Sequence, residues 1–441
     1  MAKATKSAAL SSDEHLQQAL VPKEEQPYRI PKNWVWTRLR RMVATSKERT
    51  IDFSIGNHRF VGLEHLEGNI GISGFSSTGN IKSPKNVFHS GEILYGKLRP
   101  YLNKHGLAEW DGVCSTDILV FRVMPAAIPE YVNYFLDTDA LIKFAVENSK
   151  GINLPRVSEK TLVTIPCPLP PLPEQQRIVD CIESLFSKLD NAKEIVQNAL
   201  DSFETRKAAI LHKAFTGELT AKWREEHNVG FGSWHQKRFD QVADIKSNLV
   251  KPEEYQNFPH IAPDNIEKKT GILLNYHTIS EDKVISSNHR FYPGQILYSK
   301  IRPYLSKVVM IDFDGLCSAD MYPIEAKEST RYLWYFMLSD GFLEQASSAG
   351  TRSVLPKINQ KELSALSVTI PTFDEQAEIV RILDDVFPKE QQAKKVAEAV
   401  LGQIDLMKKA ILARAFRGEL GTNDPKEESA IELLKQCINN E

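Results

Sequence analysis

The stretch GEILYGKLRPYLNK at residues 91–104 recurs as GQILYSKIRPYLSK at residues 294–307, with ten of fourteen positions identical. Two more pairs follow in the same order: DGVCSTD (111–117) with DGLCSAD (314–320), and KAAILHKAFTGEL (207–219) with KKAILARAFRGEL (408–420). The separations are nearly constant, at 203, 203 and 201 residues. Matches at a fixed spacing indicate repeated architecture, and a spacing this long indicates two copies of a whole domain rather than a solenoid.

Each copy starts with a mixed α+β globule, expected over residues 28–165 and 223–369. Short apolar runs broken by turn residues, such as ILVFRV (118–123) and NVFHSGEILYGKL (86–98), predict strands. The stretch YVNYFLDTDALIKFAVENS (131–149) has apolar residues at helical spacing. It predicts one amphipathic helix, and so does its partner at residues 331–348.

Each copy then continues into a long helix, expected within residues 166–222 and 370–421. After the proline-rich run IPCPLPPLP (165–173), apolar residues alternate at spacings of four and three, which is the pattern of a coiled-coil seam. Gly217 and Gly418 are suitable helix stops. The expected seam residues are Ile178, Ile182, Leu185, Leu189, Val196 and Phe203 in the first helix and Ile379, Leu383, Val386, Val400, Ile404 and Met407 in the second.

A helix of this length with one apolar stripe needs a partner, and the matching patterns make the other helix the natural one. We therefore expect an antiparallel coiled coil with pseudo-two-fold symmetry that separates the two globules. In the alternative arrangement, each helix packs back onto its own globule. At the ends of the chain we expect a flexible arm at residues 1–27 and a tail at residues 422–441, with a short helix near residues 430–437 that closes against the other end of the chain.

The composition is that of an ordinary globular protein, with 42% hydrophobic residues and a net charge of −2. No apolar run reaches the roughly 18 residues of a membrane span, and the N-terminus lacks the apolar segment of a secretory signal. The five cysteines form no C-x-x-C pair, which argues against a disulfide framework and a zinc ribbon. These features predict a cytoplasmic protein without a metal site.

Catalytic motifs are absent from the sequence. It contains no G-x-x-x-x-G-K-[ST], no G-x-G-x-x-G after a strand, no H-E-x-x-H and no G-x-S-x-G. Asp111 and Asp117 recur as Asp314 and Asp320, so a paired-carboxylate site is conceivable. No Glu-x-Lys follows Asp117 on the next strand, as a metal-dependent nuclease would need, so we favour a structural function for Asp117 at a turn.

The repeated motif Lys-x-Arg-Pro-Tyr-Leu-x-Lys forms a local basic island in a slightly acidic chain, because residues 93–108 and 296–311 contain no acid. Cations on a proline-stiffened turn suit contact with a nucleic-acid backbone, although a structural turn with solvated cations is the alternative. A second basic loop, at residues 150–156 and 350–357, is equally compatible with an ordinary domain-closing loop. The candidate DNA-binding residues are Lys97, Arg99, Tyr101, Lys104, Lys150, Arg156, Lys300, Arg302, Tyr304, Lys307, Arg352 and Lys357.

Taken together, these segments resemble the specificity (S) subunit of type I restriction–modification enzymes. The resemblance lies in PLPPLPEQQRIV (168–179) and its looser copy IPTFDEQAEIV (370–380), and in AFTGEL (214–219) with AFRGEL (415–420). It covers residues 28–421, nearly the whole chain. The second copy departs from the pattern, because it lacks the proline run and carries Pro388 inside its helix, where a proline can introduce a kink.

The resemblance implies that the globules are target recognition domains, each reading one half of a bipartite double-stranded DNA sequence. The helices would set the spacing between the half-sites and dock two methyltransferase (M) subunits, which carry S-adenosylmethionine and methylate adenine. Restriction (R) subunits using ATP and Mg²⁺ would join where the system has them. This chain would then be a non-catalytic subunit without a cofactor of its own, in the cytoplasm of a bacterium or archaeon.

Two other classes of function remain open at this point. The chain could be the recognition half of a nuclease or methyltransferase with a catalytic site that carries no familiar motif. It could also be a coiled-coil scaffold with no function in DNA binding.

Overall fold

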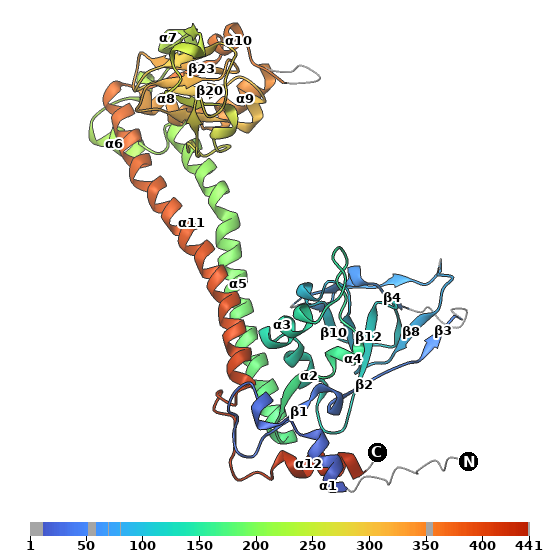
Figure 1. Cartoon of the computed structure of the whole chain (residues 1–441). Coiled ribbons are helices and arrows are strands. Elements are labelled where there is room, and N and C mark those ends of the chain that lie inside the picture. The colour runs from blue at the N-terminus through green and yellow to red at the C-terminus, as the bar shows by residue number, and fades with distance from the viewer. Residues whose placement is uncertain (1–11, 52–58, 69, 80, 350–355, 440–441) are drawn as a thin grey trace. The chain divides into compact units, whose positions relative to one another are not determined.

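The computed structural model describes residues 12–51, 59–68, 70–79, 81–349 and 356–439, and the chain divides into two compact units. Unit 1 comprises residues 1–195 and 400–441, and unit 2 comprises residues 196–399. Each unit holds one globule and one part of each of two long helices (Figure 1).

The globule of unit 1, domain 1, contains a four-stranded and a five-stranded sheet. The first has the order β10 (His105–Leu107), β9 (Ile93–Gly96), β12 (Ile118–Val123) and β2 (Val43–Thr45). The second has the order β3 (Arg49–Thr50), β8 (Lys85–Phe88), β11 (Gly112–Cys114), β4 (Arg59–Val61) and β7 (Ser76–Ser77). Two-stranded pairs join β1 (Val35–Arg38) to β13 (Pro166–Leu169) and β5 (Leu66–Glu67) to β6 (Gly71–Ile72).

The globule of unit 2, domain 2, repeats this plan. Its four-stranded sheet has the order β15 (Ala243–Ile245), β23 (Met321–Ala326), β20 (Ile296–Ser299) and β21 (Val308–Met310). Its five-stranded sheet has the order β16 (Leu249–Val250), β19 (Asn288–Phe291), β22 (Gly315–Cys317), β17 (Pro259–Ile261) and β18 (His277–Thr278), and β14 (His235–Arg238) pairs with β24 (Ser367–Ile370). Mixed α/β domains in tandem, as expected from the repeated sequence, are therefore confirmed.

One expected helix in each domain is in fact two. Residues 131–149 lie in α2 (Pro129–Leu136) and α3 (Asp139–Glu147), and the partner segment lies in α8 (Thr330–Met337) and α9 (Asp340–Ala349). The break occurs because Thr138 caps the second helix, its hydroxyl accepting a hydrogen bond from the backbone N–H of Leu141 at 3.4 Å. Ser339 caps α9 in the same way, through the N–H of Phe342.

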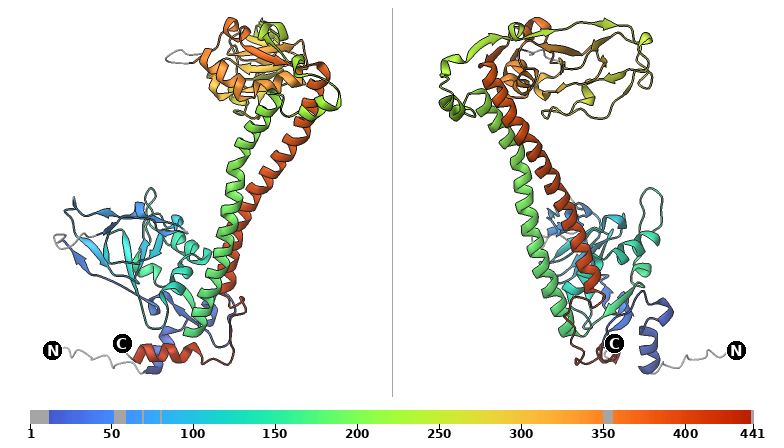
Figure 2. Two further views of the ribbon diagram at one scale, coloured as in Figure 1. Left: turned by 180° about the vertical axis from the view of Figure 1, so that it is seen from behind. Right: turned by 90° about the vertical axis from the view of Figure 1, so that its left-hand side faces the viewer.

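The long helices are α5 (Leu172–Phe215) and α11 (Phe373–Ala415), and α11 continues through Pro388. They lie side by side in every view (Figures 1 and 2). In unit 1, Lys193 pairs with Asp405 at 3.2 Å and Asp190 with Lys408 at 2.5 Å. In unit 2, Arg206 pairs with Glu390 at 3.0 Å and Glu204 with Lys394 at 3.5 Å. Residue numbers rise along one helix as they fall along the other, so the expected antiparallel pairing is confirmed.

Each globule also packs onto the helices, so the two arrangements considered from the sequence are combined. In unit 1, Ile178 and Ile182 share one apolar core with Tyr131 of domain 1 and with Phe416 beyond α11. The corresponding core of unit 2 contains Leu211, Ala214, Ile379 and Leu383 together with the strands and helices of domain 2. Four short helices of the two globules and their connections are α4 (Glu159–Leu162), α6 (Ala221–Glu226), α7 (Phe239–Val242) and α10 (Gln360–Ser364).

The expectation of a flexible arm at residues 1–27 stays a prediction, and residues 1–11 lie outside the described residues. Helix α1 (Ser12–Ala19) packs against α12 (Ala430–Asn439), and Leu16, Ala19 and Val21 are buried (Figure 1). These few apolar residues are sufficient to hold α1 in place because the C-terminal segment covers them. The short helix expected near residues 430–437 is confirmed, and it closes against the N-terminal segment.

Candidate nucleic-acid interface

The repeated Lys-x-Arg-Pro-Tyr-Leu-x-Lys motif forms the same tight turn in both units. Pro100–Leu102 and Pro303–Leu305 are single 3-10 turns, and each follows an arginine in the left-handed conformation. The φ angles are 53° for Arg99 and 48° for Arg302, a region that L residues rarely adopt and that costs roughly 1–3 kcal/mol. The same costly backbone in both copies indicates that the position of this turn matters to the protein.

Four of the predicted DNA-binding lysines stabilise the turn from within. The ammonium groups of Lys97 and Lys104 donate hydrogen bonds to the carbonyls of Thr116 and Leu63, both at 2.7 Å. The equivalent groups in unit 2, of Lys300 and Lys307, donate to the carbonyls of Ala319 at 2.5 Å and of Pro263 at 2.6 Å. These contacts fix neighbouring loops, and the contribution of the four lysines to DNA contact stays a prediction.

The structure brings the two predicted basic segments of each unit together. In unit 1 the backbone N–H of Arg99 donates to the carbonyl of Pro155 at 2.7 Å, and in unit 2 that of Arg302 donates to Pro356 at 2.7 Å. Arg156 forms an ion pair with Asp117 at 3.3 Å, and Lys357 forms one with Asp320 at 3.0 Å. The structural function expected for Asp117 at a turn stays a prediction. Arg352 lies outside the described residues.

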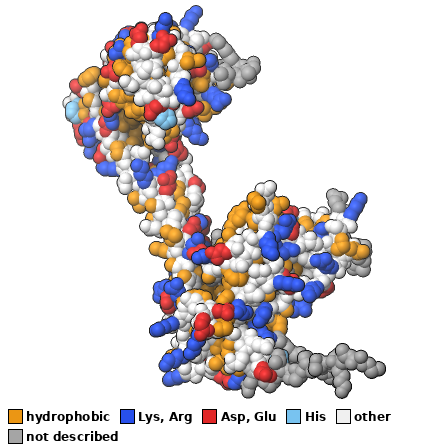
Figure 3. All heavy atoms as spheres, in the orientation of Figure 1, with side chains coloured by type: hydrophobic (Ala, Val, Ile, Leu, Met, Phe, Trp, Pro, Cys, Tyr) orange, Lys and Arg blue, Asp and Glu red, His pale blue; other side chains and the backbone are white. Residues whose placement is uncertain are grey.

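The side chains that remain available at this turn are Arg99, Tyr101, Lys150, Arg302 and Tyr304, all of which are exposed. Tyr101 and Tyr304 are 54% and 48% exposed, which is high for aromatic residues. A guanidinium beside an exposed phenol can donate hydrogen bonds to phosphate oxygens. Figure 3 shows further Lys and Arg side chains on the visible face of domain 1.

Among the described residues, no group of three or more His, Cys, Asp or Glu side chains could hold a metal ion. None of the described helices is long and apolar enough to cross a membrane. Asp111, considered above as part of a carboxylate pair, accepts a hydrogen bond from the backbone N–H of Ser90 at 2.8 Å, which lowers its pKa.

The predicted seam residues differ in how deeply they are buried. Ile178, Ile182, Phe203, Ile379, Leu383 and Ile404 are buried, Leu185, Leu189, Val196, Val386 and Val400 are half-buried, and Met407 is 50% exposed. In unit 1, Leu185, Leu189, Met407 and Ile411 line an apolar hollow of about 370 Å³ on the helix pair. Met407 is exposed because a two-helix seam leaves the rim of this hollow uncovered.

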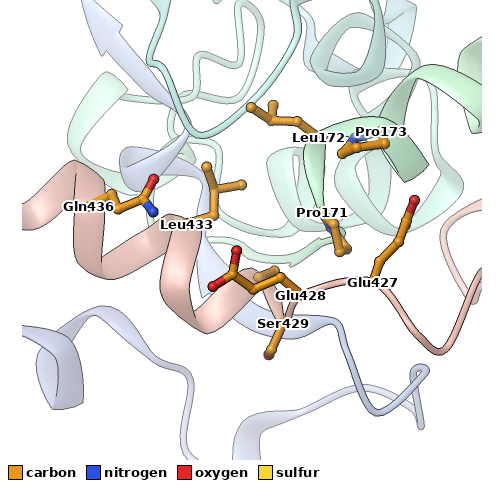
Figure 4. A pocket seen from close by; sticks show the side chains of 9 residues that line it. Pro171, Leu172, Pro173, Glu427, Glu428, Ser429, Leu433 and Gln436 are labelled. Atoms are coloured by element: carbon orange, nitrogen blue, oxygen red, sulfur yellow. The ribbon is translucent and has the colours of Figure 1, made fainter.

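A second hollow, of about 240 Å³, lies in unit 1 where α5 begins (Figure 4). Its walls are Pro171, Leu172 and Pro173 on one side and the residues around Glu428 and Leu433, at the start of α12, on the other. None of the predicted DNA-binding or seam residues lines it.

A buried glutamate fastens the two long helices in each unit, a function that the sequence analysis missed. In unit 1, Glu174 at the start of α5 accepts a hydrogen bond from the hydroxyl of Thr422, which follows α11. In unit 2, Glu375 at the start of α11 accepts one from Thr220, which follows α5. Both distances are 2.7 Å, and both glutamates are fully buried. The sequence held a signal for this contact, because Glu-Gln at 174–175 recurs at 375–376 and Gly-Glu-Leu at 217–219 recurs at 418–420.

Two copies of one α/β domain, each joined to part of an antiparallel helix pair, define a duplicated two-domain architecture. The model of the type I restriction modification DNA specificity domain matches residues 31–199 and again residues 232–399, and the chain belongs to this family. Each matched stretch lies within one of the two copies found in the sequence.

Curated relatives carry matching names. The chain is 40% identical over 300 residues to the EcoDI specificity subunit of a type I restriction enzyme from Escherichia coli, a match that covers 63% of this chain and 68% of the relative. It is 23% identical over 305 residues to the StySPI specificity subunit from Salmonella potsdam, covering 66% and 65%. The chain thus spans about two thirds of the length of these relatives. The resemblance to a specificity subunit is confirmed.

Solved structures share the fold. A chain from a study of complex assembly and conformational transition in the type I R-M system superposes with a TM-score of 0.73 at 20% identity, covering 89% of this chain and 100% of that one. The HsdS subunit from Thermoanaerobacter tengcongensis gives a TM-score of 0.61 at 20% identity, covering 90% and 100%.

Proposed function

We propose that this chain is the subunit that gives a type I restriction–modification complex its DNA specificity, with each domain reading one half of a bipartite target. The observation that carries the proposal is the duplication of a whole domain together with its helix, matched in both halves by one specificity-domain family. Two reading domains on one chain suit a target made of two short sequences separated by unspecified bases. Exposed Arg99, Lys150 and Arg302 would contact phosphates, which position the domains on the duplex.

The helix pair would set the distance between the half-sites and dock two methyltransferase subunits. An apolar hollow such as that around Leu185 and Met407 suits a protein partner, because exposed apolar patches on a helical surface mark interaction sites. The partners would bring S-adenosylmethionine and methylate adenine, and restriction subunits with ATP and Mg²⁺ would join where present. This chain would contribute recognition and no catalytic group.

The spacer function is tested by shortening both helices at once. Deletion of residues 194–200 together with residues 398–404 keeps the register, because Lys193 still faces Asp405 on one side of the cut and Glu204 still faces Lys394 on the other. Each helix loses seven residues, or about 10 Å, and nearly whole turns are removed. At about 3.4 Å per base pair, the gap in the methylated motif should shorten by about three base pairs.

Methylated adenines are mapped in a host that expresses the chain with its methyltransferase subunits, and co-purification shows which complexes assemble. Deletion of residues 194–200 alone is the control, since it breaks the pairing of the helices and should abolish assembly. An assembled double-deletion complex that methylates the wild-type motif with its original gap would contradict the spacer function. Methylation or cleavage of plasmid by the purified chain alone would favour an enzyme instead.

A further inference from the structure

The five-stranded sheets of the two domains have the same strand order and the same register. In domain 1, Val113 of β11 faces Val87 of β8 on one side and Phe60 of β4 on the other. In domain 2 the corresponding central residue, Leu316 of β22, faces Arg290 of β19 and His260 of β17. The central pairing with β4 or β17 is parallel in both sheets. Each position of one sheet therefore has a defined counterpart in the other.

The inner face of these sheets is apolar at three matched positions in both domains, while the matched pair Asn86 and His289 beside them differs. Successive strand residues alternate between the two faces of a sheet. The residues that follow Val87, Val113 and Phe60 in the sequence therefore point to the opposite, inner face. The matched inner pairs are Val61 with Ile261, Phe88 with Phe291, and Cys114 with Cys317, and all six side chains are fully buried. Burial raises the pKa of the Cys114 thiol to about 12. At these three positions the inner face is thus kept as an apolar core.

The outer face of the same strands differs in chemical type. In the row that crosses the sheet, the residues of domain 1 are Val87, Val113, Phe60 and Ser76, and those of domain 2 are Arg290, Leu316, His260 and His277. Only the buried central position stays apolar in both, at Val113 and Leu316. The other three positions change from apolar or hydroxyl side chains to one guanidinium and two imidazoles.

In domain 2 the polar row is held in a fixed geometry. The guanidinium of Arg290 lies 5.3 Å from the ring of Tyr255, 5.7 Å from that of Phe258 and 4.9 Å from that of Tyr292. Aromatic rings around a guanidinium orient it while leaving part of it accessible. The Arg290 side chain is 30% exposed.

The two histidines of the row share one carboxylate. Nδ1 of His260 donates to Asp282 at 2.7 Å and Nδ1 of His277 donates to it at 3.0 Å. The hydrogen bond from His260 helps to hold the pKa of Asp282 below its ordinary value. With Nδ1 occupied, Nε2 of the 67% exposed His277 is the nitrogen left to meet another molecule.

The corresponding row of domain 1 offers apolar surface. Val87 and Phe60 are half-buried, Ser76 is exposed, and the ammonium of Lys85 lies 5.8 Å from the ring of Phe60. Within unit 1 this sheet lies on the side of the domain remote from the helix pair (Figure 1). Packing onto the helices therefore does not explain why the row differs between the domains.

We propose that the outer row of each five-stranded sheet reads the bases of its half-site. The proposal rests on the function proposed above and names the residues that would carry it: Arg290, His260 and His277 in domain 2, and Phe60, Val87 and Ser76 in domain 1. Two domains on one scaffold can read different sequences only where their side chains differ, and this row combines a shared register with different chemistry. Arginine pairs with the O6 and N7 atoms of guanine, whereas apolar side chains contact the methyl group of thymine. The half-site of domain 2 should therefore contain a guanine at the position of Arg290.

The test is a map of methylated adenines in a host that expresses the chain with its methyltransferase subunits. His277→Ala removes an exposed ring, and Arg290→Lys keeps the charge but loses the two-pronged donor geometry of arginine. Each of these two variants should accept additional bases at one or two positions of a single half-site. Discrimination against the wrong base should fall on the order of tenfold there. Ser76→His, at an exposed position of domain 1, should alter the other half only.

Arg238→Ala is the matched control, because Arg238 is an exposed arginine of domain 2 that lies outside this sheet. It should leave the motif unchanged. The proposal is overturned if all three row variants keep the wild-type motif, if they weaken methylation equally at every base sequence, or if one variant changes both halves. A wild-type complex without a split motif would instead overturn the proposed function itself, so the two failures can be told apart.

Discussion

The two buried glutamates that fasten the helices occupy equivalent positions but have different partners. Glu375 in unit 2 accepts hydrogen bonds from Thr220, from Arg224 and, at 2.9 Å, from the indole N–H of Trp234. Glu174 in unit 1 accepts from Thr422 and, at 2.7 Å, from Arg177. Burial raises the pKa of the Glu174 carboxyl. The carboxylate and the threonine are kept in both units, while the arginine comes from a different element in each.

The arginines differ in what else they hold. Arg224 follows α5, its side chain is 11% exposed, and it also donates to the carbonyl of Gly217 at 2.6 Å. Arg177 lies on α5 itself, is 37% exposed, and divides its guanidinium between Glu174 and Glu427. The two units therefore keep the contact between a buried glutamate and a threonine, but they differ in which arginine pairs with the glutamate. The sheet faces follow the same rule, with three kept inner positions and a changed outer row.

The largest effect should come from removing the glutamate of unit 2. Glu375→Ala leaves the buried Arg224 guanidinium without its carboxylate, and loss of one partner from a buried pair costs about 3–5 kcal/mol. Glu174→Ala should cost about 1–3 kcal/mol, because Arg177 keeps its ion pair with Glu427. The free energy of unfolding is measured by chemical denaturation of the full chain for both variants.

Glu378→Ala is a suitable control on the same helix, since Glu378 pairs with the exposed Arg381 and should change stability by less than about 1 kcal/mol. Equal losses for Glu375→Ala and Glu174→Ala would refute the difference drawn between the two fastenings.

A smaller effect, of opposite sign, is expected at a position that the two domains share. Tyr95 and Tyr298 are fully buried, and neither hydroxyl has a hydrogen-bond partner within the described part of the chain. Burial raises the pKa of both phenols. An unpaired buried hydroxyl is costly, so Tyr95→Phe and Tyr298→Phe should each stabilise the protein by about 1 kcal/mol.

Thermal and chemical unfolding of the two variants measures the gain in stability. Because the tyrosines occupy matched positions on β9 and β20, the gains should agree between the domains. A loss of stability in either variant would mean that its hydroxyl has a partner in solution and that the domains differ here as well.

The smallest effect is expected along the helix pair. The pair Asp190–Lys408 in unit 1 and the pair Arg206–Glu390 in unit 2 are both partly exposed. Double-mutant cycles should give coupling energies of about 0.2–1 kcal/mol for each, decreasing with added salt. A coupling well above this range in one unit would show that ion pairs, rather than apolar contacts, fix the helix register there.

The sequence alone was sufficient for the features that repetition or periodicity encodes. The duplication, the strands around ILVFRV, the long helices and their antiparallel pairing all follow from patterns that extend over many residues. The break at Thr138 was missed because a single capping hydroxyl outweighs a continuous apolar pattern.

Side-chain partners could not be predicted in the same way. Lys97 and Lys104 were predicted as DNA contacts from their charge, yet their ammonium groups meet backbone carbonyls of loops distant in the sequence. The outer row of the five-stranded sheet was missed because it joins four strands whose order in the sheet differs from their order in the chain. Only the register of those strands shows that Phe60 and His260, or Val87 and Arg290, are equivalent.

The most direct test of the whole interpretation is the methylated motif of the wild-type chain, expressed with its methyltransferase subunits and mapped across a genome. Two domains that share a core but differ in their reading rows should give two different short half-sites separated by a constant run of unspecified bases, with methylated adenine in the motif. A single continuous motif, or a motif with two identical halves, would contradict it.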